Sequence, residues 1–265
     1  MATITPLFRT GEISVHRFNH PAEHEDQPYE EIASSYMASF VEDGAFNLSV
    51  DDKSWRVGAG DVMLSRPGMR FRASFDGAGF NDTCLSLTYL AAGDDGFDPE
   101  RSWNKTNRSV LSATNRLRYL QWGLRRAVNT GSPMFAEYCA TEIFREVPNG
   151  RSATLISERK FSWYAERIEF ARERLAADLD KELTASALAR SVGMSMFHFT
   201  RLFTELVGRP PHRYRLRARL DAAFEMLRAG RSVTETCYAC GFNNLSHFSR
   251  SFARAFGAPP SRIAG

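Results

Sequence analysis

Hydrophobic and polar residues alternate over roughly the first ninety positions of the chain. Phe46, Leu48 and Val50 recur at period two, as do Phe71, Ala73 and Phe75, and this period is typical of strands with one buried face. Further short apolar runs are found at 35–41, 55–57, 61–65 and 85–89. Turns are predicted between the runs, at Asp43-Gly44, Gly58-Ala-Gly60, Pro67-Gly68 and Asp76-Gly77. Several short strands at this spacing predict a β-sandwich or a small barrel.

The hydrophobic period changes to that of an α-helix near position 104. Leu117, Leu120 and Leu124 share one helical face, and a second apolar face runs from Phe135 to Ile143. Because only a short break at Gly131-Ser-Pro133 separates the two helices, they are expected to pair antiparallel. Residues 91–103, rich in Gly and Asp, are predicted to form a loop, and the polar residues 148–162 a linker.

The last hundred residues are helical throughout and contain a repeat. The segment from Gly193 to Phe203 recurs from Gly241 to Phe252, with a shared His-Phe-(Thr/Ser)-Arg-x-Phe core. Thr184, Ser195, Ser232 and either Asn243 or Asn244 are the expected N-caps, and the two glycines are the expected turns. Each copy therefore predicts a helix-turn-helix unit, the layout that places its second helix in the major groove of DNA.

The second helix of each copy separates a core face from a candidate DNA-reading face. The core is predicted at Phe199 and Phe203 in the first copy and at Phe248, Phe252 and Phe256 in the second. The candidate base contacts, on the opposite faces, are Met196, Phe197, Thr200 and Arg201 in the first copy and Leu245, Ser246, Ser249 and Arg250 in the second.

The chemistry of these candidates fits the edges of DNA bases. Arg201 and Arg250 can bridge O6 and N7 of guanine, although each can instead contact only phosphate. Contact with a thymine methyl group would explain Phe197 and Leu245 as exposed residues. Arg213 and Arg215, on the helix that joins the copies, are predicted to contact phosphate.

Charge is divided unevenly along the chain. Residues 1–100 hold 7 Lys and Arg against 17 Asp and Glu, whereas residues 101–265 hold 27 against 14. A polyanionic partner therefore fits the C-terminal part and not the N-terminal part.

Residues 163–262 resemble the DNA-binding domain of the AraC-type (AraC/XylS) bacterial transcription regulators. The resemblance is carried by Ala189, Gly193, Ser195, Phe199, Arg201, Phe203, Gly208 and Pro211, by Arg219, Leu220 and Ala223, and by Gly241, Phe242, Phe248, Arg250, Phe252, Gly257, Pro259 and Pro260. The departures are Thr236, where the family usually has an apolar residue, and Asn243-Asn244 in place of the commoner Ser-Asp.

The resemblance implies an α+β chain with four parts. These are a cupin-like β sensing domain at 1–103, a helical hairpin that dimerises at 104–147, a linker at 148–162, and the DNA-binding domain at 163–265 with its two helix-turn-helix motifs. The segment from Gly60 to Gly68 also resembles the second cupin signature. The implied partners are double-stranded DNA, a second copy of the chain, a small-molecule effector and, for an activator, RNA polymerase.

Three residues of the β domain are candidate effector contacts. Arg70 and Arg72 alternate with Phe71, so either one can pair with a carboxylate effector if it faces the barrel interior; otherwise they form an exposed polar face. Trp55 is the third candidate, with core packing as its alternative.

No metal or cofactor is expected. The positions after Pro67-Gly68 lack the histidine of metal-binding cupins, and His16, His20 and His24 fall in a stretch expected to be a loop. Cys237-x-x-Cys240 has no second pair to complete a zinc site, so these cysteines are expected in the core.

The sequence contains no motif typical of catalysis, no secretory signal and no run of 18 apolar residues. We therefore expect a cytoplasmic, sequence-specific transcription regulator, outside the membrane and not an enzyme, that responds to an effector. The alternatives are a dimeric regulator without an effector and a cupin enzyme with an attached DNA-binding domain.

Overall fold

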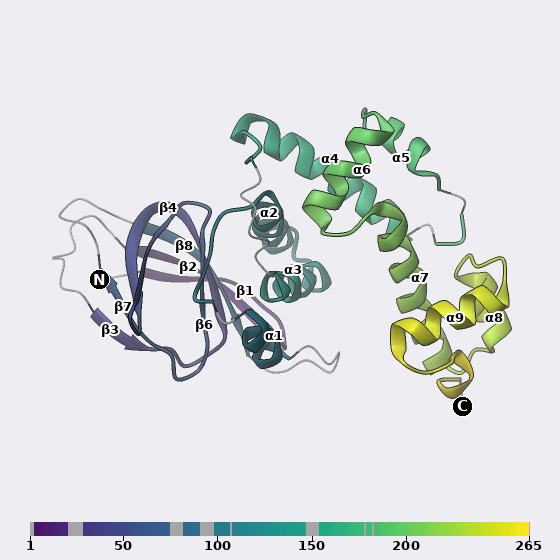
Figure 1. Ribbon diagram of the computed structural model, residues 1–265, viewed down its shortest axis with the longest axis horizontal. Helices are drawn as coiled ribbons and strands as arrows, with labels where there is room; N and C mark the ends of the chain where they lie inside the picture. Colours follow the sequence, from purple (N-terminus) through teal and green to yellow (C-terminus); the bar gives the residue numbers. More distant parts are fainter. Residues whose placement is uncertain are drawn as a thin grey trace. The chain divides into compact units, whose positions relative to one another are not determined.

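A computed structural model describes residues 3–20, 29–74, 82–90, 98–106, 108–146, 154–177, 179–181 and 183–264. The chain divides into two compact units, Met1–Leu155 and Ile156–Gly265. The strands (Figure 1) are β1 Thr3–Arg9, β2 Ile13–His20, β3 Tyr29–Ile32, β4 Met37–Val50, β5 Lys53–Gly58, β6 Val62–Ser65, β7 Arg70–Ser74, β8 Asp82–Tyr89 and β9 Val110–Leu111. The helices are α1 Pro99–Thr106, α2 Asn115–Thr130, α3 Pro133–Arg145, α4 Glu158–Ala177, α5 Ala185–Ser191, α6 Met196–Val207, α7 Pro211–Arg228, α8 Val233–Ala239 and α9 Leu245–Phe256.

The long strand β4 organises the N-terminal unit. Its first part pairs antiparallel with β6 and β8, and its second part pairs antiparallel with β5 and β7. Since one strand serves both groups, the sheet folds over on itself around a core that includes Phe40, Leu48, Phe71 and Leu85. This architecture confirms the predicted barrel or sandwich, followed by a helical hairpin and an all-α C-terminal unit.

The turn predicted at Asp43-Gly44 is wrong, because β4 continues through it. The pairing register with β8 shifts between Val41 and Asp43, and Gly44 has a φ of 76°. Glycine permits this left-handed conformation, which bends the strand as a β-bulge. Gly44 and Ala45 remain paired with the neighbouring strands, so the chain bends without reversing. The turn predicted at Asp76-Gly77 lies outside the described residues.

Part of the loop predicted at 91–103 is helical, since α1 begins at Pro99. The Asp98 side chain accepts hydrogen bonds from the backbone nitrogens of Glu100 and Arg101, at 2.9 and 3.2 Å. A proline at the first helical position and an Asp before it are favourable at a helix start. Trp103 is buried in the core of the N-terminal unit, and α1 packs against α3.

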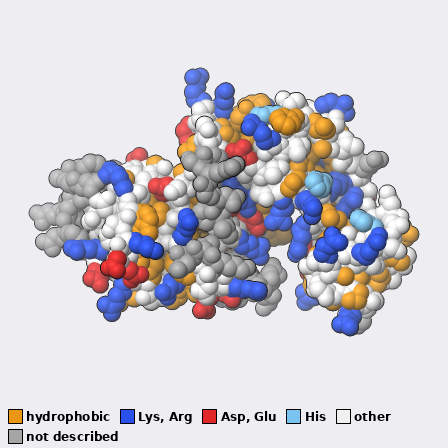
Figure 2. Space-filling model, viewed as in Figure 1, with side chains coloured by type: hydrophobic (Ala, Val, Ile, Leu, Met, Phe, Trp, Pro, Cys, Tyr) orange, Lys and Arg blue, Asp and Glu red, His pale blue; other side chains and the backbone are white. Residues whose placement is uncertain are grey.

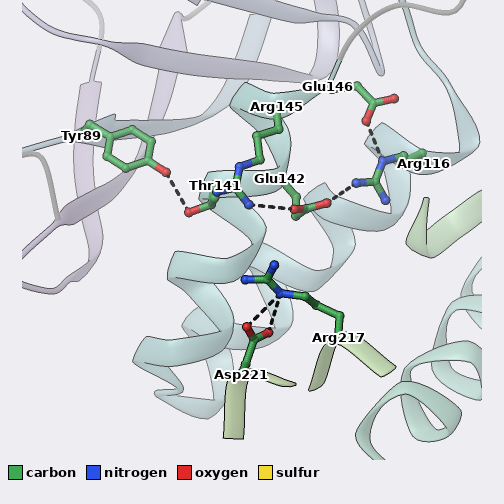
Figure 3. A network of polar contacts seen from close by, with 8 residues as sticks. All are labelled: Tyr89, Arg116, Thr141, Glu142, Arg145, Glu146, Arg217 and Asp221. Carbon is green, nitrogen blue, oxygen red and sulfur yellow. Dashed lines mark hydrogen bonds and ion pairs between the residues drawn. The ribbon is translucent and has the colours of Figure 1, made fainter. Parts of the chain in front are cut away.

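Helices α2 and α3 form the predicted hairpin and lie beside the sheet (Figure 1). Arg116 of α2 makes ion pairs with Glu142 and Glu146, at 2.5 and 2.6 Å, and so ties the hairpin together (Figure 3). The Tyr89 hydroxyl of β8 lies 3.3 Å from the Thr141 hydroxyl, and the Tyr89 ring packs edge-on against Phe144. The hairpin therefore rests on the face of β8 to which Tyr89 belongs.

The C-terminal unit contains only helices among its described residues. Helix α4 begins at Glu158, inside the segment predicted as linker. Thr184, Ser195, Ser232 and Asn244 accept the expected capping hydrogen bonds at the starts of α5, α6, α8 and α9. Both glycines at the predicted turns have left-handed φ values, 68° at Gly193 and 76° at Gly241. These features match the two helix-turn-helix units predicted from the repeat.

Candidate nucleic-acid interface

Helix α6 presents one buried face and one exposed face. Phe199 and Phe203 are fully buried, whereas Met196 is 57% exposed and Phe197 is 79% exposed. Arg201 is exposed and Thr200 is half-buried. A phenyl ring left this open to water is unfavourable, so Phe197 marks a surface suited to contact with another molecule.

Helix α9 repeats this arrangement with more polar residues. Leu245 is 39% exposed, Ser246 and Arg250 are exposed, and Ser249 is half-buried. The Nε atom of Arg250 donates to the carbonyl oxygen of Ser246 at 3.3 Å. This bond holds the arginine side chain along the first turns of the helix, the part that reads base edges in helix-turn-helix proteins.

Helix α7 contacts both helix-turn-helix copies through aromatic side chains, one toward each of its ends. Tyr214 packs edge-on against Phe203 of α6, with ring centroids 5.8 Å apart. Phe224 stacks on Phe256 of α9, with ring centroids 4.8 Å apart. The 18 residues of α7 span roughly 27 Å, which approaches the ~34 Å of one DNA turn. Lys and Arg side chains gather over part of this unit (Figure 2).

Arg213 is exposed on α7, as a phosphate contact requires. The prediction for Arg215 is wrong, because only 8% of this residue is exposed and its Nη2 donates to the carbonyl oxygen of Lys181. A guanidinium held inside the fold by a backbone carbonyl braces α7 against the segment before α5. The alternation of arginines along α7 did not reveal which of them faces inward.

Arg70 and Arg72 are exposed, the alternative expected for them, and do not face the barrel interior as the predicted effector contact required. On β7, Phe71 and Ala73 are buried, whereas Arg70 and Arg72 are exposed. Successive side chains of a strand point to opposite faces, so the arginines point away from the core into solvent. Trp55 is partly buried and packs against the core, the alternative expected for it.

A polar face that the sequence pattern did not reveal lies on the opposite side of the sheet from α3. His16, Ser86 and Ser39 stand directly opposite one another on β2, β8 and β4, so they share one face. Thr88, two positions from Ser86, shares it too. The Ser39 and Ser86 hydroxyls lie 2.9 Å apart, and Thr88 Oγ1 lies 3.3 Å from His16 Nε2. We name these four residues the polar face.

The ionisation of the polar face follows from its burial. Burial lowers the pKa of His16 below its ordinary value of 6.5, because the charged imidazolium is poorly solvated there. The imidazole is therefore neutral at neutral pH, and the four side chains offer hydrogen-bond donors and acceptors without formal charge.

No group of three or more His, Cys, Asp or Glu able to hold a metal ion occurs within the described ranges. His16 and His20 belong to β2 rather than to the expected loop, and His24 lies outside those ranges. Cys237 and Cys240 are free and fully buried, as predicted, and burial raises the pKa of both thiols. No helix in the described part of the chain is long and apolar enough to cross a membrane.

Comparison with known proteins finds relatives of these helices. Residues 188–264 match the family model described as "Helix-turn-helix domain". The relatives include the probable transcriptional regulator LumQ of Photobacterium leiognathi, 32% identical over 85 residues, and the transcriptional activator RhaS of Salmonella arizonae, 37% identical over 84 residues. Residues 188–264 therefore form a helix-turn-helix domain similar to that of these regulators. The matches cover 32% and 31% of this chain, and 34% and 30% of those regulators.

Similar solved structures include a transcriptional regulator with an AraC-type DNA-binding domain from Chromobacterium violaceum. It is 28% identical and covers 37% of this chain and 89% of that one with a TM-score of 0.36. The unsaturated fatty acid-bound ToxT of Vibrio cholerae is 13% identical and covers 97% and 96% of the two chains with a TM-score of 0.39. A cupin superfamily protein from Desulfitobacterium hafniense is 12% identical and covers 34% and 79%, with a TM-score of 0.29.

Proposed function

We propose that this chain is a sequence-specific DNA-binding transcription regulator, in which α6 and α9 read bases in two successive major grooves. The observation that carries the proposal is the pair of exposed reading faces, each opposite a buried aromatic core and both mounted on α7. The candidate base contacts are those predicted from the repeat, at Met196, Phe197, Thr200, Arg201, Leu245, Ser246, Ser249 and Arg250.

Selection of bound sequences from random duplex DNA by the full chain, followed by footprinting, tests this proposal. We expect a preferred site with two protected segments about one helical turn, or roughly 10 base pairs, apart. A variant with Phe197→Ala and Leu245→Ala should lose preference at thymine positions. Equal affinity for all duplexes of one length would contradict the proposal.

The regulator responds, on this proposal, to an uncharged polar effector bound at the polar face. Three of its four residues are hydroxyl-bearing, and the fourth is a neutral imidazole with a depressed pKa. Such groups can hydrogen-bond a neutral polar ligand and supply no positive charge to pair with a carboxylate. Ligand binding changes the regulator's activity only if it favours one arrangement of the chain over another.

A thermal-shift screen of neutral polar metabolites against anionic ones tests this effector class. We expect stabilisation by members of the neutral group, lost in Ser86→Val and retained in Arg70→Ala and Arg72→Ala. The absence of stabilisation by any compound would favour the alternative, a dimeric regulator that needs no effector.

The proposal also includes the oligomeric state of the chain and the absence of catalysis. The chain acts as a homodimer through the α2–α3 hairpin, where Met134 is 83% exposed, and an activator would also contact RNA polymerase. Sedimentation of wild type and Met134→Glu tests the dimer, which the glutamate should weaken.

The chain carries no catalytic activity on this proposal. Stoichiometric metal in the purified protein would instead favour a cupin enzyme with an attached DNA-binding domain.

A further inference from the structure

A cavity of about 430 Å³ lies inside the C-terminal unit, beside α7. Its walls come from the end of α4, from α5 and α7, and from the turn that precedes α9. Apolar side chains predominate among them, including Leu175, Leu188, Leu216 and Phe242. Small-molecule sites have volumes of about 300–1,000 Å³ and mostly apolar walls with a few polar groups.

Beside Arg215, which donates to the Lys181 carbonyl oxygen, Arg219 of α7 brings a second positive charge to this cavity. Its Nε donates to the Leu179 carbonyl oxygen at 2.8 Å, and its guanidinium lies 5.9 Å from the centroid of the Phe242 ring. Within the described part of the chain, the two Nη atoms of Arg219 have no hydrogen-bond acceptor. The two Nη atoms can therefore bind a carboxylate through two parallel hydrogen bonds.

The surroundings of Arg219 do not neutralise it. No carboxylate occurs among the described residues that line the cavity, which instead include Arg215, His212 and His247. Asp180 is exposed, and its charge acts to raise the pKa of Arg219, but the two form no ion pair among the described residues. Burial lowers the pKa of Arg219 below its ordinary value, the sign of a positive charge that is desolvated without full compensation.

We propose that the cavity binds a small organic monocarboxylate, with its carboxylate paired to Arg219 and its apolar body against Leu188, Leu216 and Phe242. The ligand would touch both helix-turn-helix copies, since Leu188 belongs to the first and Phe242 to the second. Its binding would therefore set the arrangement of α6 relative to α9 and change DNA affinity. Only this last consequence rests on the proposed function.

Calorimetric titration of the full chain with phenylacetate and hexanoate, each against its neutral amide, tests the site directly. We expect saturable binding of both acids and binding at least about tenfold weaker for the amides, because the amides lack the charge that pairs with Arg219. Arg219→Gln should remove the preference for acid over amide, and Arg219→Lys should retain part of it. Leu216→Trp should fill the cavity and block acid binding.

The matched control is Arg217→Gln. Arg217 also lies on α7 but is exposed and paired with Asp221 at 2.8 Å, so its replacement should leave acid binding unchanged. Equal binding of acids and amides, no saturable binding of either acid, or unchanged acid binding in folded Arg219→Gln would each overturn the site. The acid–amide comparison on wild type decides the matter even if the variants fail to fold.

DNA binding with and without saturating phenylacetate tests the consequence. We expect a change of at least about threefold in wild type and none in Leu216→Trp. An unchanged affinity would overturn the coupling between cavity and DNA. A loss of DNA affinity in Arg219→Gln, without acid binding to wild type, would make Arg219 a phosphate contact and overturn the site. Failure of wild type to bind any DNA sequence would instead refute the proposed function and leave the acid titration standing.

Discussion

The first helix-turn-helix copy, α5 and α6, presents an apolar reading surface, whereas the second copy, α8 and α9, presents a more polar one. Met196 and Phe197 are both more exposed than Leu245, and a serine stands beside Leu245 where Phe197 stands beside Met196. The backbones match in their caps and turn glycines. The repeat therefore preserves the backbone arrangement, and on the proposed function the differing exposed residues would give the two copies different base preferences.

The turn glycines differ in their surroundings, although both have left-handed φ values. A Cβ added at Gly193 meets no atom within 4 Å, whereas one added at Gly241 would overlap the Leu179 carbonyl oxygen and the Arg219 guanidinium. Substitutions at matched positions of the two copies therefore measure how the copies differ in stability and in DNA binding.

The largest effect is expected from Gly241→Ala. Gly193→Ala should cost about 1–2 kcal/mol, the price of a left-handed conformation for an L-residue. Gly241→Ala should cost several kcal/mol, since a backbone carbonyl cannot move aside as a flexible side chain does. Urea unfolding of the two full-length variants measures the difference, and equal losses would show that the second turn has room.

Arg215→Ala comes next and is paired with Arg213→Ala. Loss of the buried Arg215 should lower the free energy of unfolding by about 1–3 kcal/mol, because it leaves the Lys181 carbonyl without this donor. Arg213→Ala should leave stability nearly unchanged and reduce the salt dependence of DNA binding by about one counterion. Unfolding curves and salt titrations of both variants separate bracing from phosphate contact; a stable Arg215→Ala that binds DNA weakly would reverse the assignment.

Arg250→Ala should cost about 1–3 kcal/mol at one base pair and relax the sequence preference there. Arg201→Ala is its counterpart in the first copy and should relax a different position of the same site. Binding to a set of single-base variants of the selected site measures both effects. A uniform loss on every sequence would make the arginine a phosphate contact.

The smallest effect is expected at Thr236, which occupies in α8 the place that Leu188 holds in α5. Both are buried, and the Thr236 hydroxyl has no hydrogen-bond partner among the described residues. Thr236→Val should therefore raise the free energy of unfolding by about 1 kcal/mol. The control is Thr234→Val, at an exposed position, which should have little effect; no gain at Thr236 would indicate that its hydroxyl is satisfied.

A local feature could be predicted where all the residues that produce it lie in one short segment. The caps at Thr184, Ser195 and Ser232 were predicted because a hydroxyl three residues before a backbone nitrogen can accept its hydrogen bond in any protein context. The aromatic core of α9 was predicted for a similar reason, since its spacing alone places Phe248 and Phe252 on one face.

Errors arose where distant segments decide the outcome. Asp43-Gly44 has the composition of a turn, but pairing on both sides keeps it inside β4. Whether Arg215 faces solvent depends on the carbonyl of Lys181, which approaches it from another segment. The polar face was missed because His16 and Ser86 become neighbours only when β2 pairs with β8.

The amino-acid sequence by itself determined the tandem helix-turn-helix design, the α+β organisation and which faces of α6 and α9 are buried, because these follow from periodicity and repetition along one stretch of chain. Only the tertiary structure decided which arginines are buried, where Arg70 and Arg72 point, and that a cavity lies beside Arg219. Those properties depend on contacts between residues far apart in the chain, and no local pattern encodes the burial that such contacts create.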